Sequence, residues 1–290
     1  MNAVAVPRGA APWIWLLPAL LLLLPGFVLP IALVVRNSLN IDDPLGGMVA
    51  AFTIANYADI LTDLFYARIF ANSLLLSAGC ALFCLLICYP VAYHMALRAS
   101  APARILFWLV YTPLLVSVMV RVFGWIILIS DTGLMNSLLL GSGLLSQPLR
   151  WLYDTEGTVI GLVHRYLPLM MLPLYTAMRK IDGALIRASV SLGGSEWDSF
   201  RRVVVPLSIP GCVAGLQLVF AGAISDFVLP NLMGGTSLRL LAPTVLSEAV
   251  TEVNLARSAT LATLMLLGVG IVLVVTQRAV ARWCRWAANV

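Results

Sequence analysis

Few residues in this 290-residue chain carry side chains suited to acid–base or metal chemistry. The two histidines, His94 and His164, are not accompanied by any metalloprotease or nucleophile motif. Cys80, Cys84 and Cys88 recur every fourth residue, which places them on one face of a helix, and none of the five cysteines forms a CxxC pair. We therefore expect small apolar packing from the cysteines, and no catalytic centre, metal site or cofactor.

Nucleotide binding is also excluded for this chain on its own. A phosphate-binding loop of the P-loop type needs Gly-Lys followed by Ser or Thr. Lys180 is the only lysine, and it lies between Arg179 and Ile181. Any ATP that drives this protein must therefore be bound by another subunit.

Three charged residues, Arg121, Arg165 and Asp226, fall within segments that are otherwise apolar. A charge is costly in lipid, so each is expected to face protein or a water-filled path. Counted at about 1.5 Å per residue along a helix, all three lie toward the outer leaflet. We expect Asp226 to pair with Arg121 or Arg165, with Trp125 nearby. The cluster is then either an outer gate of a translocation path or a purely structural ion pair.

Composition indicates the elements that position these residues. The chain is 61% hydrophobic and 11% charged, with a mean hydropathy of +0.98, whereas soluble domains are about 45–50% apolar and about 25% charged. Its apolar runs are near the roughly 20 residues that a helix needs to cross a bilayer, which favours helices over barrel strands. The predicted fold is all-α integral membrane with about six transmembrane helices. The predicted spans are residues 12–35, 70–97, 104–129, 158–178, 205–229 and 259–282.

Basic residues divide unequally between the two sides that these spans separate. Eleven lie on one side and five on the other, and the poorer side carries nine acidic residues. Cytoplasmic loops carry an excess of Arg and Lys, so both termini are expected in the cytoplasm. The first span is too long for a secretion signal and is expected to be a retained anchor. The eleven are Arg8, Arg98, Arg104, Arg179, Lys180, Arg187, Arg201, Arg202, Arg278, Arg282 and Arg285.

The cytoplasmic loop at about 179–204 contains signals for two short helices. Asp182 can cap the first helix, Gly193 and the next glycine provide its stop, and Ser195 with Asp198 forms a capping box that starts the second. Composition fits two interpretations equally, an amphipathic helix pair on lipid headgroups or a docking surface for a partner. The apolar residues expected to be exposed here are Leu185, Ile186, Leu192, Trp197 and Phe200.

A motif in this loop resembles a known family. Residues 185–211, LIRASVSLGGSEWDSFRRVVVPLSIPG, are similar to the cytoplasmic EAA loop of binding-protein-dependent ABC importer permeases. Arg187 stands where that family usually has Glu, and Ser189 replaces its second Ala. The resemblance implies an ATPase-coupling site, although Arg187 alters the usual charge pattern there. The implied site residues are Arg187, Ala188, Leu192, Gly193, Trp197, Phe200, Arg201 and Pro206.

Further segments resemble the spermidine/putrescine branch of these permeases. They are Asn72-Ser73, YPVAYHMAL from Tyr89, VRVFGWIILISDTGLMNSLL from Val120, YLPLMMLPLY from Tyr166 and SDFVLPNLMGG from Ser225. The resemblance implies a type I importer permease fold. Residues 1–57 would form the N-terminal tail, first transmembrane helix and outer loop, and residues 58–290 a core of five transmembrane helices. It also implies a transport subunit of the bacterial inner membrane that is not itself an enzyme.

The solute and partners follow from the same resemblance. A polyamine or related organic cation is expected, with an opine, an amino-acid derivative or an anion as alternatives. The implied partners are a second permease subunit, identical or different, two cytoplasmic ATP-binding subunits, an extracytoplasmic solute-binding protein and the lipid bilayer, with no nucleic acid. An ion-coupled secondary transporter is the alternative from another class, and such proteins often show inverted repeats. An enzyme acting on lipids would need a polar catalytic cluster at the membrane surface.

Overall fold

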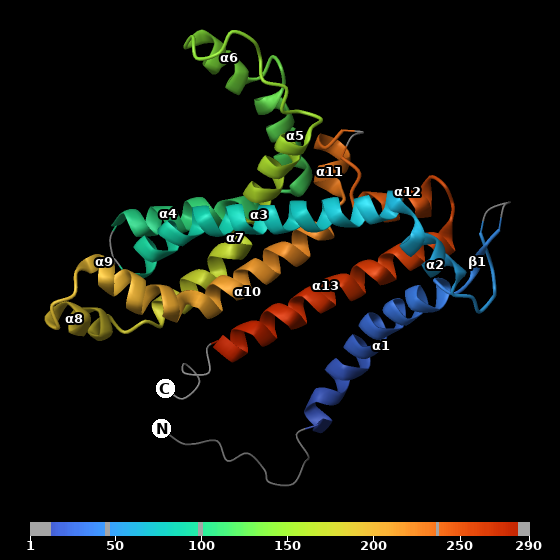
Figure 1. Cartoon of the computed structure of the whole chain (residues 1–290), viewed down its shortest axis with the longest axis horizontal. Coiled ribbons are helices and arrows are strands. Elements are labelled where there is room, and N and C mark those ends of the chain that lie inside the picture. The colour runs from blue at the N-terminus through green and yellow to red at the C-terminus, as the bar shows by residue number, and fades with distance from the viewer. Residues whose placement is uncertain (1–12, 44–46, 98–100, 236–237, 284–290) are drawn as a thin grey trace.

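The computed structural model describes residues 13–43, 47–97, 101–235 and 238–283, which are mostly helical. Long helices run side by side, with α8 and α9 at one end and α2 and α12 at the other (Figure 1). Six helical segments are long and apolar enough to cross a membrane, in agreement with the predicted number. They are Leu16–Asn37, Leu64–Leu97, Val118–Gly141, Thr155–Arg179, Glu196–Ile224 and Leu255–Arg282.

Long helices form the body, and short ones connect them. The long helices are α1 (Trp13–Asn37), α3 (Leu64–Leu97), α7 (Thr155–Arg179), α10 (Val205–Ile224) and α13 (Leu255–Trp283). The short ones include α2 (Ala55–Thr62), α6 (Leu134–Gly141), α8 (Gly183–Ser191), α9 (Glu196–Ser199), α11 (Val228–Met233) and α12 (Leu241–Val250), with a π-helical turn at Phe200–Val204 between α9 and α10. Strands β1 (Ile41–Asp42) and β2 (Met48–Val49) pair antiparallel, with Ile41 opposite Val49.

The prediction of one helix over residues 104–129 is wrong. Helix α4 (Ala101–Tyr111) passes into a 3₁₀ helix, η1 (Thr112–Leu115), and α5 (Val118–Ile129) begins after two extended residues. Pro113 lies at this break, where its ring removes a backbone donor that a continuous helix would use. As a result α5 leaves the direction of the long helices, and α5 and α6 rise away from them in Figure 1.

The helix predicted over 205–229 also ends earlier than expected. Helix α10 stops at Ile224 and α11 starts at Val228, so Asp226 lies in the joint between them. The Oδ1 atom of Asp226 accepts hydrogen bonds from the amides of Val228 at 3.0 Å and Leu229 at 3.3 Å. The carboxylate therefore stabilises the first turn of α11 in place of a continued helix.

The core lies where α3, α7 and α10 pack together. Cys80, Cys84 and Cys88 are buried there, and the thiols of the last two donate to carbonyls of α7 at 3.5 and 3.4 Å. The packing role predicted for Cys80, Cys84 and Cys88 is thus confirmed, whereas Cys212 is half-buried and Cys284 lies outside the described residues. Helix α10 approaches α7 closely because it has Gly211, where an added Cβ would overlap Ala177. Small residues at helix contacts are typical of membrane bundles.

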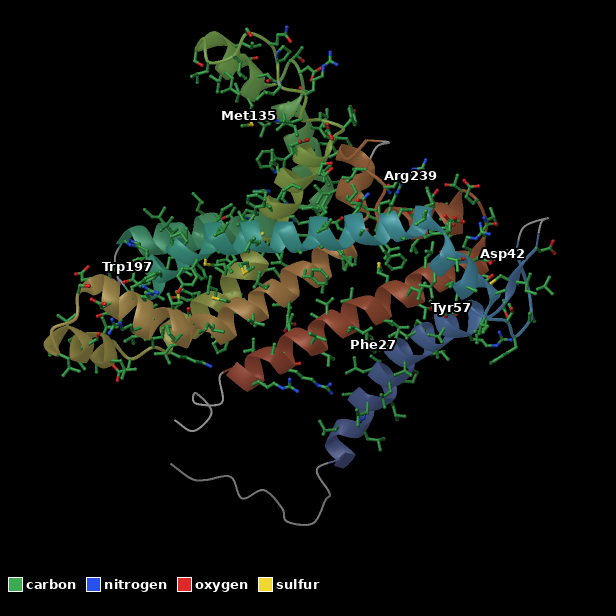
Figure 2. All side chains as sticks on the ribbon, viewed as in Figure 1. Phe27, Asp42, Tyr57, Met135, Trp197 and Arg239 are labelled. Carbon is green, nitrogen blue, oxygen red and sulfur yellow. The ribbon has the colours of Figure 1, made fainter. Side chains whose placement is uncertain are left out.

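The N-terminal helix packs along the last one, since α1 lies against α13. The hairpin after α1 is also tied to α13, because Asp42 accepts hydrogen bonds from the amides of Ala256 at 2.7 Å and Arg257 at 3.1 Å. Asp42 and Arg239 lie at the end of the molecule opposite Trp197, which belongs to the 179–204 loop (Figure 2). The division of the chain at residue 57 stays a prediction.

Candidate functional site

A buried ion pair joins α7 to the α10–α11 joint. The Nη1 atom of Arg165 lies 3.2 Å from Oδ2 of Asp226, and the two side chains are 27% and 1% exposed. Asp226 was expected to pair with either Arg121 or Arg165, and in the structure its partner is Arg165. Because its other oxygen accepts the two α11 amides, the carboxylate has partners on both oxygens. A buried ion pair is tolerated only with such additional hydrogen bonds.

Tyr166 adds a third side chain to this pair. Its hydroxyl lies 2.7 Å from the carbonyl oxygen of Gly222 and 3.2 Å from Oδ2 of Asp226. An added Cβ at Gly222 would overlap the tyrosine ring, so the glycine makes room for it. Tyr166 begins one of the segments that resemble the spermidine/putrescine branch, but it is not among the predicted site residues. The signal available was a tyrosine within an apolar span, since a buried tyrosine hydroxyl usually has a hydrogen-bond partner.

Arg121 shares a small cavity with this cluster but makes no comparable contact. The cavity has a volume of about 10 Å³, room for roughly one water molecule, and Arg165 also lines it. The Nε and Nη1 atoms of Arg121 are buried and have no hydrogen-bond partner among the described residues. The predicted grouping of Arg121, Arg165 and Asp226 in one region is thus observed, with Arg121 left unpaired.

Trp125 and His164 form the wall next to Arg121. The indole nitrogen of Trp125 donates to Nδ1 of His164 at 3.1 Å, and the two rings meet edge to face with centroids 5.3 Å apart. His164 is therefore held by a hydrogen bond from a neighbouring helix. The same two side chains line a second, larger cavity of about 710 Å³, whose other walls include Phe83 and Trp151.

The loop between α7 and α10 has the caps that the sequence predicts. Asp182 accepts a hydrogen bond from the amide of Ala184 at 2.8 Å and starts α8. Gly193 follows α8 with φ of +89°, a conformation that residues with a side chain adopt only at a cost. Ser195 accepts from the amide of Asp198 at 3.1 Å, and Asp198 accepts from the amide of Ser195 at 3.1 Å, which completes the capping box.

The apolar residues of this loop fall into two groups. Leu192 and Trp197 are 90% and 66% exposed. Phe200 stacks on Trp197 with a centroid distance of 5.3 Å, but its other contacts are with Tyr89 and Tyr93 of α3 at 6.0 and 5.3 Å. Phe200 is thus only partly exposed and not fully exposed as predicted, because its ring packs against α3 from the π-helical turn. Ile186 is also only partly exposed.

The remaining predicted loop residues are mostly exposed as well. Ala188, Arg187 and Arg201 are exposed, and Pro206 is partly buried in the first turn of α10. Arg202 lies 3.5 Å from Asp198 in an exposed ion pair, a type that contributes little to stability. Apolar and cationic side chains therefore share one surface. Of the arginines used for orientation, Arg8, Arg98 and Arg285 lie outside the described residues, as does the side chain of Arg104.

The cluster shows no arrangement suited to a metal ion. In the part of the chain that the structure describes, no three His, Cys, Asp or Glu side chains are grouped closely enough to hold one. Two guanidinium groups beside one carboxylate favour ion pairing between helices over ligation of a cation. This group of charged side chains can hold α5, α7 and the α10–α11 joint together when its ion contacts form, and release them when those contacts break.

Comparisons with known proteins cover nearly all of these elements. Residues 89–286 match the family described as binding-protein-dependent transport system inner membrane component. The spermidine/putrescine transport system permease protein PotB of Haemophilus influenzae is 34% identical over 227 residues, which is 78% of this chain and 79% of that protein. PotB of Escherichia coli K12 is 32% identical over 207 residues, 71% of this chain and 75% of that protein.

A solved structure shares the fold. It is the crystal structure of a bacterial alginate ABC transporter in complex with an alginate pentasaccharide-bound periplasmic protein. The matching chain superposes with a TM-score of 0.76 at 13% sequence identity, over 93% of this chain and 94% of that chain. At this identity the likeness supports the architecture alone.

Proposed function

This chain belongs to the family of binding-protein-dependent transport system inner membrane components, and we propose that it is a permease subunit that imports a polyamine. Family membership makes it a multi-pass membrane transport protein and not an enzyme. It also argues against an ion-coupled secondary transporter. The observation that supports a polyamine as the solute is the similarity to spermidine/putrescine permeases, which extends over more than two thirds of this chain and of each relative.

The loop of residues 179–204 is the proposed contact with an ATP-binding subunit. Its two capped helices present Leu192 and Trp197 to solvent, an arrangement suited to insertion into a groove of a soluble partner. The positive φ of Gly193 sets the angle between the helices. Arginines around the apolar pair would meet acidic groups of the ATPase, or lipid phosphates on the alternative interpretation. A second permease, two ATP-binding subunits and an outer solute-binding protein complete the proposed assembly.

The cluster of Asp226, Arg165, Arg121 and Trp125 is the proposed outer gate. Charges within spans are expected beside protein or a water-filled path, and these four belong to three different segments of the fold. Trp125, together with His164, lines both the small cavity of the cluster and the cavity of about 710 Å³. Movement of its helix would therefore change both spaces. A structural ion pair without gating is the alternative.

The proposed location is the bacterial inner membrane, with both termini and the 179–204 loop in the cytoplasm. The support is the eleven-to-five division of basic residues. The placement of α8 and α9 at the end of the long helices opposite α2 and α12 agrees with this orientation (Figure 1).

Uptake by a strain that lacks this chain tests the solute. We expect deletion to reduce ATP-dependent accumulation of labelled spermidine, and expression of the chain to restore it. Excess unlabelled putrescine should compete, whereas an opine should not. Unchanged spermidine uptake in the deletion strain, together with loss of labelled opine uptake that the chain restores, would replace the polyamine with that alternative solute.

A further inference from the structure

The buried charge cluster contains one more guanidinium group than its carboxylate can satisfy. Oδ2 of Asp226 faces Arg165 and Tyr166, while Oδ1 accepts two backbone amides. Arg121 is left with two buried nitrogen atoms and no acceptor within the described ranges. Buried guanidinium nitrogens without acceptors are unfavourable, so this half-buried arginine is expected to have an acceptor in some state of the protein.

Asp226 is the carboxylate of the same cluster. Arg121, Arg165 and Leu229 line one small cavity. The amide of Leu229 donates to Asp226 and Arg165 pairs with it, so two of the residues that line this cavity with Arg121 contact the carboxylate. The ion contact with Arg165 is also not a well-aligned hydrogen bond, because its Nη1 atom is among the buried nitrogens without one. The carboxylate can therefore exchange one guanidinium partner for the other without leaving its amide contacts.

Helix α5, which carries Arg121, is built to move as a unit. Only Val122 and Ile129 are buried along it. Its N-terminal end follows the extended residue Ser117, and its C-terminal end is followed by a turn at Gly133. Figure 1 shows the helix leaning away from the long helices. A segment with few buried residues and a non-helical joint at each end is typical of elements that shift as rigid pieces.

We propose that Arg121 is the second partner of Asp226 in the transport cycle. The carboxylate binds Arg165 in the resting state, and it binds Arg121 when α5 moves onto the α10–α11 joint during the ATP-driven stroke. Arg121 thus stabilises one of two arrangements of the gate and is a positioning residue. This inference rests on the proposed function of the chain as an importer permease.

Opposite effects of two matched variants test the exchange. The complete importer is reconstituted in liposomes, and ATP hydrolysis is measured with and without solute-loaded binding protein. Arg165→Gln removes the resting partner, so basal hydrolysis should rise severalfold. Arg121→Gln removes the partner of the other state, so stimulated hydrolysis and uptake should fall about tenfold, as expected for a shift of roughly 1.4 kcal/mol between two states. Arg150→Gln, at an exposed arginine, serves as control.

The outcomes separate this inference from the proposed function. If the wild-type importer shows no stimulation by the binding protein, the proposed function fails. If stimulation is normal and Arg121→Gln behaves as wild type, Arg121 is only solvated by a water in its cavity and the inference is wrong. If Arg121→Gln does not reach the membrane, two other variants test the inference. Arg165→Gln should then show raised basal ATP hydrolysis, and Arg121→Lys should show partial uptake. Wild-type values in both variants would contradict the inference.

Discussion

Asp226 is the residue at which three parts of the fold meet. Its carboxylate accepts the first amides of α11, faces Arg165 of α7 and lies within hydrogen-bonding distance of the Tyr166 hydroxyl. Few side chains in the spans have as many polar contacts at so low an exposure. Asp226 therefore has two roles. It accepts hydrogen bonds at the start of α11, and its negative charge balances the positive charge of Arg165.

Replacing Asp226 by Asn separates these two tasks. Asparagine has the same size, and its side-chain oxygen can still accept the amides of Val228 and Leu229, so the chain should insert and assemble normally. It cannot balance the charge of Arg165, and uptake should fall about tenfold or more because the buried arginine loses its counter-charge. Labelled-solute uptake, normalised to the amount of protein in the membrane, measures the effect.

A second aspartate provides the control for this variant. Asp63 is exposed and accepts a hydrogen bond from the amide of Phe65 at 2.8 Å, so Asp63→Asn makes the same chemical change at the start of another helix. It should transport as wild type. If Asp226→Asn is expressed normally and shows full uptake, the ion pair has only a structural role and does not take part in gating.

At the residue scale the sequence predicts which charges gather but not how they pair. Helical rise alone places Arg121, Arg165 and Asp226 at similar depth. The choice of Arg165 depends on the break after Ile224, which no periodicity shows because the helices on both sides of it, α10 and α11, are largely apolar. The direction of Phe200 was missed for a similar reason, since a π-helical turn rotates its ring relative to a regular helix.

At the element scale, the two capped helices of the 179–204 loop are the segment suited to docking. Their boundaries could be predicted because Asp182, Gly193 and Ser195 are capping residues, and capping depends on local chemistry. The break at Pro113 was not predicted, because prolines elsewhere lie inside continuous helices, as Pro90 and Pro168 do. Whether a proline breaks a span depends on neighbouring helices, which the local sequence does not show.

Changes in this loop should uncouple ATP hydrolysis from transport. Gly193→Val forces a branched side chain into positive φ at a cost of about 1–2 kcal/mol and tilts the two helices. Trp197→Asp removes an exposed apolar contact. Both variants should stay in the membrane and keep the companion permease, while binding less ATPase in co-purification from mild detergent and showing reduced uptake.

Gly143→Val is the matched control for the glycine variant. Gly143 also has positive φ, +74°, but it lies beyond α6, far along the chain from the loop. This variant carries similar backbone strain and should retain ATPase binding. If Gly193→Val and Trp197→Asp both retain wild-type coupling, the loop is an interfacial helix pair and the coupling proposal fails.

At the scale of the whole molecule, composition predicts the number of membrane-spanning helices. Apolar runs of bilayer length predicted six helices, and six segments of that kind are found in the described chain. What could not be predicted is the arrangement of α5 and α6, which rise from the long helices in Figure 1. Hydropathy reports that a segment prefers lipid or protein to water, but not which neighbour it packs against.

Reporter fusions test the orientation of the whole chain. Fusions at Arg104, Arg187 and Arg285 should report cytoplasm, and fusions near Asp43, Asp154 and Glu248 should report the outer side, because basic residues favour the cytoplasmic face. Alkaline phosphatase and green fluorescent protein activities give complementary readouts. An outer signal from Arg187 would overturn both the orientation and the docking of the loop.

The central claim is that this chain couples ATP hydrolysis in a partner subunit to passage of a polyamine delivered by a binding protein. The most direct measurement is uptake of labelled spermidine into proteoliposomes that contain this chain, its companion permease and the ATP-binding subunits. With ATP available to those subunits, we expect uptake only when spermidine-loaded binding protein is present on the opposite side of the membrane. Spermidine uptake that persists without ATP or without the binding protein would contradict the account.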